Sequence, residues 1–230
     1  MRNIAIIPAR SSSKGLKDKN IKDLYGKPLL AYSVEAANKS NIFDCIHVST
    51  DSSEYAEIAI KYGADVPFLR DEVFATDTAS TWDAVNNVLN KYLKIGKEFD
   101  VVTVLQPTSP LRTSGDICSA YQLFCVKNAL SVVSVCEVDH SPLLCNTLKK
   151  DLSLNQFIDM KKVTRRQDMN TFYRINGAIY MLDVKILNDL ENLYGGRSYA
   201  YIMEKNKSID IDDEFDFRLV EYMMALNEKK

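Results

Sequence analysis

The sequence predicts an α/β fold of the doubly wound type, in which helices cover both faces of a mostly parallel sheet. Along the first 138 residues, short apolar runs alternate with segments that carry apolar residues at helical spacing. A length of 230 residues suits one domain with a full core. A polar, irregular stretch, residues 139–173, then interrupts the alternation. We therefore predict a single domain, residues 1–230, with an insert over residues 139–175.

Strands are expected where apolar residues run without interruption, and helices where they recur at helical spacing. The predicted strands are residues 4–9, 45–50, 101–105, 130–138 and 177–182. The predicted helices are residues 28–39, 53–62, 81–93, 116–126 and 215–226. Strands and helices that alternate in this way build a parallel sheet through crossover connections.

Composition narrows the class of protein. The net charge is −2, with 46% hydrophobic and 26% charged residues, so the basic excess of nucleic-acid binders is absent and no nucleic-acid partner is expected. Five scattered cysteines, without a C-x-x-C pair, and two histidines indicate reduced core thiols rather than a disulfide framework. The apolar run before Arg10 is too short for a secretory signal, and no stretch approaches a membrane span. A cytoplasmic protein with no membrane partner is expected.

The loop after the first predicted strand has the composition of a phosphate-binding loop. Residues 10–20 hold four basic side chains, three hydroxyls and one glycine against a single acid. A solvated surface loop is the alternative, and the common glycine-rich phosphate motifs do not fit because only Gly15 is present. Ligands of open α/β sheets bind beyond the carboxyl ends of strands, which is where this loop lies. Its position therefore favours a bound polyphosphate.

A pair of acids near the end of the chain indicates a metal site. If residues 208–212 are extended, Asp210 and Asp212 point to the same side and their carboxylates can converge on one cation. Mg²⁺ prefers one or two carboxylates together with waters and substrate phosphates. Asp213 and Glu214 are interpreted differently, as acids that favour the N-terminus of the following helix.

These two motifs resemble those of the sugar-activating cytidylyltransferases, and of the acylneuraminate (CMP-sialic acid) synthetases in particular. The first-loop pattern of that family, apolar-x-A-R-x-x-S-K-G-x-x-x-K-N, is matched at Ala9, Arg10, Ser13, Lys14, Gly15, Lys19 and Asn20. The S-x-D-I-D metal motif is matched at Ser208, Asp210, Ile211 and Asp212. Ser12 and Lys17 stand where glycine and proline are common, and neither change removes a cation.

Further matches lie between these ends in the order that the family has. A Q-x-T-S-P-x-R pattern is matched at residues 106–112, a hydroxyl-rich segment at 76–81, an R-R-Q-D pattern at 165–168 and R-I-N-G-A-I-Y at 174–180. Taken alone, the first could be a rigid turn, the second a simple helix cap and the third a solvated basic pair. The resemblance gives them functions at a nucleotide-sugar site.

The resemblance implies a nucleotide-diphospho-sugar transferase-like fold and a reaction that joins CTP to a nine-carbon 2-keto sugar acid, releasing pyrophosphate with Mg²⁺ as cofactor. The implied catalytic residues are Asp210, Asp212, Arg166, Arg10 and Lys19, and the first two would also hold the metal. The implied nucleotide-binding residues are Ala9, Arg10, Ser13, Lys14, Lys19, Asn20, Arg70, Thr78 and Ser80. The implied sugar-binding residues are Gln106, Thr108, Arg166 and Tyr180.

The insert, residues 139–175, has two interpretations. It could be disordered, or, as the resemblance implies, it could form an arm that pairs two subunits and carries Arg166 to the neighbouring site, which predicts a homodimer. Other substrates stay open: legionaminate, pseudaminate or the eight-carbon Kdo, the last disfavoured because Kdo enzymes usually lack the K-N end of the first loop. A noncatalytic CTP-binding regulator is the alternative of another class, and the paired Asp210 and Asp212 argue against it.

Overall fold

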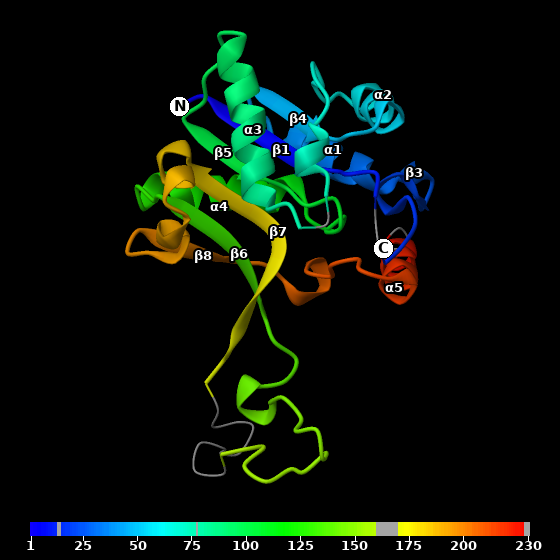
Figure 1. The fold of residues 1–230 in the computed structure, drawn as a ribbon, viewed down its shortest axis with the longest axis vertical. Helices are drawn as coiled ribbons and strands as arrows, with labels where there is room; N and C mark the ends of the chain where they lie inside the picture. Colours follow the sequence, from blue (N-terminus) through cyan, green and yellow to red (C-terminus); the bar gives the residue numbers. More distant parts are fainter. Residues whose placement is uncertain (13–14, 77, 160–169, 228–230) are drawn as a thin grey trace.

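The computed structural model describes residues 1–12, 15–76, 78–159 and 170–227. At its centre is a six-stranded sheet of order β4-β1-β5-β7-β6-β8 (Figure 1). Its strands are β1 (Asn3–Pro8), β4 (Cys45–Ser49), β5 (Val101–Val104), β6 (Ser131–Glu137), β7 (Tyr173–Asp183) and β8 (Ser198–Ile202). β7 is antiparallel to both β5 and β6, and the other neighbouring pairs are parallel. The predicted mostly parallel sheet is confirmed, with β7 as its reversed strand.

Helices cover both faces of the sheet, as a doubly wound fold requires. One apolar cluster joins the sheet to α1 (Leu29–Ser40), α2 (Ser53–Lys61) and α4 (Ser114–Val126), and a second joins it to α3 (Thr81–Lys94). The second cluster also includes residues of the 3₁₀ helices η5 (Val184–Asn188) and η6 (Leu190–Tyr194). Each predicted helix therefore exists, with ends that move by a few residues.

The C-terminal helix, α5 (Glu214–Asn227), packs away from the main sheet in a third apolar cluster. Phe217 and Val220 of this helix meet Leu24 and Leu29, beside the small ribbon of β2 (Asp23–Leu24) and β3 (Lys27–Pro28). Ile211 belongs to the same cluster and is fully buried. This packing fixes the segment that precedes α5. The other short 3₁₀ helices of the described residues are η1 (Lys19–Ile21), η2 (Glu72–Phe74), η3 (Pro142–Leu144) and η7 (Lys205–Lys207).

The pairing of β7 with β6 is interrupted near its middle. The register shifts from Val133 opposite Tyr180 to Val135 opposite Ile175, so that residues 176–179 of β7 bulge opposite Ser134. The Ser134 hydroxyl takes over as a hydrogen-bond partner, accepting from the Ile179 N–H at 2.8 Å and donating to Asn176 Oδ1 at 2.6 Å. We call residues 176–179 the β7 bulge.

The predicted insert leaves the body of the molecule as an arm. Figure 1 shows β6 and β7 running out together from the sheet into this arm, and the Val138 N–H donates to the Phe172 carbonyl at 3.0 Å. The described part of the arm exposes the side chains of four leucines, Leu144, Leu148, Leu152 and Leu154. Residues 160–169 lie outside the described residues. Among the helices of the described ranges, none combines the length and apolar character needed to cross a membrane.

Candidate functional site

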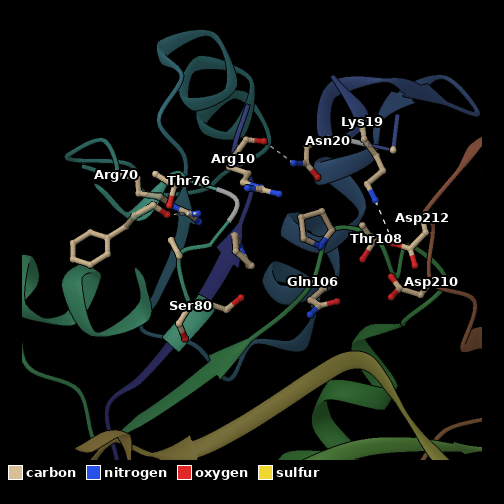
Figure 2. A pocket seen from close by; sticks show the side chains of 16 residues that line it. Arg10, Lys19, Asn20, Arg70, Thr76, Ser80, Gln106, Thr108, Asp210 and Asp212 are labelled. Atoms are coloured by element: carbon tan, nitrogen blue, oxygen red, sulfur yellow. Dashed lines mark hydrogen bonds and ion pairs between the residues drawn. The ribbon is translucent and has the colours of Figure 1, made fainter. Parts of the chain in front are cut away.

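A cavity of about 610 Å³ lies beyond the carboxyl ends of β1 and β5. Its walls come from the first loop, the segment before α3, the loop after β5 and the segment before α5 (Figure 2). The lining residues are Pro8, Arg10, Gly15, Lys19, Asn20, Arg70, Phe74, Thr76, Ala79, Ser80, Thr81, Gln106, Pro107, Thr108, Asp210 and Asp212. The structure thus gathers residues from all four segments at the sheet edge where ligands of open α/β folds bind.

The first loop is folded back on itself by hydrogen bonds. The buried Asn20 amide donates to the Arg10 carbonyl at 3.0 Å, and the Ser11 N–H and hydroxyl donate to the Asp51 carboxylate at 2.8 and 2.7 Å. Burial of Asp51 opposes its ionisation, but these two bonds and the charge of Arg70 outweigh it and lower the pKa. The loop therefore keeps Arg10 and Asn20 at the cavity. Ser13 and Lys14, predicted to bind nucleotide, lie outside the described residues.

Two guanidinium groups stand on the same side of the cavity (Figure 2). Arg70 is held from behind, since its Nε donates to Ser49 Oγ at 3.0 Å and its Nη2 to the Ser49 carbonyl at 2.9 Å. Burial lowers the Arg70 pKa to about 10, and the neighbouring charge of Arg10 acts in the same direction. Arg70 remains a cation at neutral pH. Two neighbouring positive charges favour the binding of an anion between or beside them.

The N-terminus of α3 borders the same cavity. Ser80 caps the helix, because its hydroxyl accepts from the Trp82 N–H at 3.2 Å, and Ser80 and Thr81 both line the cavity. The positive end of the helix dipole therefore faces the space beside the two arginines. Thr78, predicted to bind nucleotide, does not line the cavity; its hydroxyl lies 3.4 Å from that of Thr76, which does.

The two predicted metal ligands lie on the opposite side of the cavity, and both line it. Between them, the Ile211 N–H donates to the Thr108 carbonyl at 2.8 Å while the Ile211 side chain is buried in the third cluster. This arrangement is the one that the alternation of isoleucine and aspartate predicts, with Asp210 and Asp212 turned to one side. Lys19 joins them, since its Nζ donates to the Ile211 carbonyl at 2.6 Å and lies 3.7 Å from Asp212 Oδ1.

The two carboxylates differ in environment. Burial raises the pKa of Asp210, and the charge of Asp212 adds to this effect, whereas the Thr108 hydroxyl and Lys19 oppose it. Asp210 Oδ1 is buried without a hydrogen-bond partner among the described residues. Asp212 is largely exposed, with 82% of its side-chain surface accessible. The site therefore has one half-buried carboxylate, with an oxygen that has no partner among the described residues, and one carboxylate that faces solvent.

The acids after this pair belong to the helix. The Asp216 N–H donates to Asp213 Oδ1 at 3.0 Å, and the N–H groups of Asp212 and Asp213 donate to Asp216 Oδ2. Asp213 is thus the N-terminal cap of α5, as predicted for a helix-end acid, and its carboxylate is occupied there.

A divalent cation fits the two aspartates. The unused oxygen of Asp210 and the exposed carboxylate of Asp212 are hard donors of the kind that Mg²⁺ takes. Among the described residues, no group of three or more His, Cys, Asp and Glu side chains could hold a metal alone. A cation here would therefore need ligands beyond the carboxylates of Asp210 and Asp212, such as water or phosphate oxygens.

The loop after β5 provides the cavity floor near the acids. Gln106 and Thr108, which were predicted to bind the sugar, both line the cavity. Tyr180 does not line it: its ring packs edge-on against Trp82, with centroids 5.7 Å apart. Ala9 also lies behind the wall, fully buried, and its N–H is already donated to the Ser49 carbonyl at 2.9 Å. Arg166 lies outside the described residues.

The structure gives Gly15 and Gly177 a packing function that the sequence did not predict. A Cβ on Gly15 would lie 2.6 Å from the Asp212 carbonyl oxygen, so the first loop and the aspartate segment touch through this glycine. A Cβ on Gly177, in the β7 bulge, would lie 2.8 Å from Gln106 Oε1 and 3.7 Å from Asp210 Oδ2. Both glycines lie within matched sequence motifs, and this is the feature from which their close packing could have been predicted.

The chain belongs to the cytidylyltransferase family, whose model matches residues 4–227. It is 39% identical, over 99% of its length, to an N-acylneuraminate cytidylyltransferase of Escherichia coli O18:K1:H7, and it spans only 52% of that relative. It is 36% identical to a CMP-N,N'-diacetyllegionaminic acid synthase of Legionella pneumophila, with 100% of this chain and 99% of the relative covered.

A solved structure shares the fold. A CMP-2-keto-3-deoxy-manno-octonic acid synthetase complexed with CTP superimposes with a TM-score of 0.76, covering 99% of this chain and 100% of its own, at 17% sequence identity. The two chains therefore share the doubly wound α/β fold that the sequence predicts.

Proposed function

We propose that this protein transfers the cytidylyl group of CTP to the anomeric oxygen of a sialic acid-type 2-keto sugar acid, giving a CMP-sugar and pyrophosphate. The observation that carries the proposal is the division of charge in the cavity: Arg10, Arg70 and the α3 N-terminus lie on one side, and Asp210 and Asp212 on the other. A triphosphate suits the first side. A hydroxyl nucleophile that must lose a proton suits the second.

The names of three relatives support both the transfer of a cytidylyl group and an acidic sugar as its acceptor. The E. coli relative is named for N-acylneuraminate, the L. pneumophila relative for N,N'-diacetyllegionaminic acid, and a third relative, from Campylobacter jejuni and 32% identical, for pseudaminic acid. All three names describe cytidylyl transfer to an acidic sugar. The chain spans about half the length of the first of these relatives and 98 to 99% of the other two.

Catalysis in this proposal consists mainly of positioning and charge neutralisation. The anomeric oxygen attacks the α-phosphorus of CTP, the bond from that phosphorus to the bridging oxygen breaks, and the electron pair leaves with pyrophosphate. Arg10 and Lys19 stabilise the negative charge of the triphosphate and of the leaving group. The carboxylate of Asp210, whose pKa is raised by burial, accepts the proton that the hydroxyl loses.

Asp210 and Asp212 would hold Mg²⁺, as the donor set allows. When bound there, Mg²⁺ would supply neutralisation of the charge on the phosphate oxygens. Lys19 stands beside Asp212 and keeps a positive charge at this end of the cavity.

We also propose a homodimer built on the arm. Four leucines in the described part of the arm have exposed side chains, and the arm projects away from the body (Figure 1). Apolar side chains on an extended arm are a feature of segments that pack against another copy. Arg166, which the resemblance assigns to the neighbouring site, belongs to this insert.

The diacetylated legionaminate class is the second candidate for the sugar. The observation in its favour is the L. pneumophila relative, which is named for this sugar acid and is 36% identical to this chain over 230 residues.

Pyrophosphate release from CTP, measured with a panel of nonulosonic acids and Kdo, tests the proposal. We expect turnover with at least one nine-carbon acid and no release without a sugar acid. The matched control is Asp210→Asn, which keeps the shape of the side chain and should abolish release. Pyrophosphate release that is independent of the acid, or unaffected by this substitution, would contradict the proposal.

A further inference from the structure

Arg112 is the largest fully buried side chain among the described residues, and it does not reach the cavity. Its Nη1 donates to two main-chain carbonyls, that of Gln106 at 3.2 Å and that of Ala178 at 3.1 Å. Its Nη2 donates to Ser33 Oγ at 2.7 Å, and the Ser33 hydroxyl donates in turn to the same Gln106 carbonyl at 3.2 Å. The guanidinium therefore joins the loop after β5 to the β7 bulge.

The position of this contact follows from the register of the sheet. β5 and β7 pair up to Val104 opposite Tyr180, and the same register continued would set Gln106 opposite Ala178. At that point the strand pairing has ended, and one guanidinium nitrogen bonds both carbonyls instead. Arg112 thus stands where the ladder would continue. β5 has ended at Val104, whereas β7 continues through Ala178, and the guanidinium bonds a carbonyl on each side.

The two segments that Arg112 joins both border the acids. The Gln106 side chain lines the cavity, and Gly177, next to Ala178, leaves the space into which Gln106 Oε1 and Asp210 Oδ2 extend. Thr108, two residues after Gln106, accepts the Ile211 N–H. A shift of the Gln106 carbonyl would therefore move the side chain of Gln106 relative to Asp210.

Stability alone does not account for a cation at this position. Burial lowers the Arg112 pKa to about 10, so the group stays charged at neutral pH, and its Nε has no hydrogen-bond partner among the described residues. Buried ionic groups can often be replaced by apolar residues of similar volume without loss of stability. What an apolar residue could not reproduce is a pair of bonds to the two carbonyls.

We propose that Arg112 is a positioning residue for the acid-sugar side of the cavity, which fixes Gln106 against Gly177 and Asp210 by bonding the carbonyls of Gln106 and Ala178. The proposal rests on the proposed function for the identity of the substrate. It assigns no contact between Arg112 and either substrate.

The test compares Arg112→Lys and Arg112→Met with wild type in steady-state kinetics. Arg112→Lys keeps the charge but loses the planar fork, so we expect the KM for the sugar acid to rise roughly tenfold or more while the KM for CTP stays within about twofold. Arg112→Met should show the larger effect, so that the lysine variant rescues it in part. Ser33→Ala removes only the bridging hydroxyl and serves if the Arg112 variants do not fold; it should shift the same KM by a smaller factor.

The control is Thr103→Val, on β5. The Thr103 hydroxyl is buried without a hydrogen-bond partner among the described residues, so its loss should leave both KM values unchanged. Equal rises of the two KM values, or a loss of kcat alone with both KM values intact, in folded Arg112 and Ser33 variants would overturn the proposal.

A second readout separates this proposal from the proposed function. The side-chain amide signal of Gln106 in a ¹H–¹⁵N NMR spectrum, identified by its loss in Gln106→Glu, reports the position of that group without any substrate. It should move or broaden in Arg112→Met and stay in place in Thr103→Val. If wild type makes no CMP-sugar, the proposed function fails while this signal still tests Arg112; a signal that does not respond to Arg112→Met would refute the positioning function.

Discussion

The contact between the first loop and the aspartate segment gives the most direct perturbation of the site. In Gly15→Ala the new Cβ would lie 2.6 Å from the Asp212 carbonyl oxygen, where an ordinary contact begins at 3.4 Å. The two segments must therefore separate by roughly 0.8 Å, the difference between these distances. The first loop carries Arg10 and Lys19 and the other segment carries Asp212, so the groups that act on the phosphates would move relative to one another.

A displacement of about 1 Å in a catalytic constellation can cost on the order of a hundredfold in rate. We expect kcat/KM for CTP to fall in Gly15→Ala by roughly tenfold to a hundredfold, with the circular dichroism spectrum of the fold retained. Gly196→Ala is the matched control, because a Cβ at that position meets nothing within 4 Å. The reasoning is refuted if Gly15→Ala and Gly196→Ala have the same kcat/KM.

Three further predictions concern the acids, the buried histidine and the arm. Asp212→Asn should lower kcat on the order of a hundredfold across a Mg²⁺ titration, whereas Asp213→Asn, a change at the α5 cap, should cost only about 0.3–1 kcal/mol of stability; equal losses of kcat would contradict the assigned geometry. Burial lowers the pKa of His47 from 6.5 to about 4, so the unfolded chain binds the extra proton between these values and the free energy of unfolding should fall by about 3 kcal/mol as pH drops from 6.5 to 4. Urea unfolding measured at several pH values in this range should show that the free energy of unfolding depends less steeply on pH in His47→Gln than in wild type. An equal pH dependence in the two proteins would disprove the assignment. Sedimentation should give a dimer at micromolar concentration, and Arg166→Ala subunits mixed with Asp212→Asn subunits should regain activity; a fully active monomer would exclude the arm-mediated dimer.

The pattern of apolar residues predicted α1 to α5 and five of the six strands of the sheet, because each of these elements buries one face or both. It did not reveal the direction of β7, since a buried strand of apolar residues has the same pattern in either direction. β8 (Ser198–Ile202) was missed for a related reason: its five residues alternate small and aromatic side chains at the sheet edge and are only partly buried or exposed. Local pattern is weak where burial is incomplete.

In the candidate site, too, the features set by a few neighbouring residues could be predicted, and those set by the packing of distant segments could not. Asp210 and Asp212 could be placed on one side because the alternation of isoleucine and aspartate acts over a few residues. The orientation of Tyr180 toward Trp82, and the presence of Thr76 rather than Thr78 in the cavity wall, depend on the packing of α3 against the sheet. The contact of Arg112 with the Ala178 carbonyl joins residues 66 positions apart, and the motif matched at residues 106–112 does not indicate it.

The transfer of the cytidylyl group is tested most directly by ³¹P NMR of wild-type protein with CTP, Mg²⁺ and a nine-carbon 2-keto sugar acid. We expect the three CTP resonances to be replaced by a phosphodiester resonance of the CMP-sugar and a pyrophosphate resonance of twice its intensity, because pyrophosphate carries two equivalent phosphorus atoms. CTP that stays unchanged with every acid tested, or that gives only hydrolysis products, would contradict the proposed transfer and favour a CTP-binding protein without this activity.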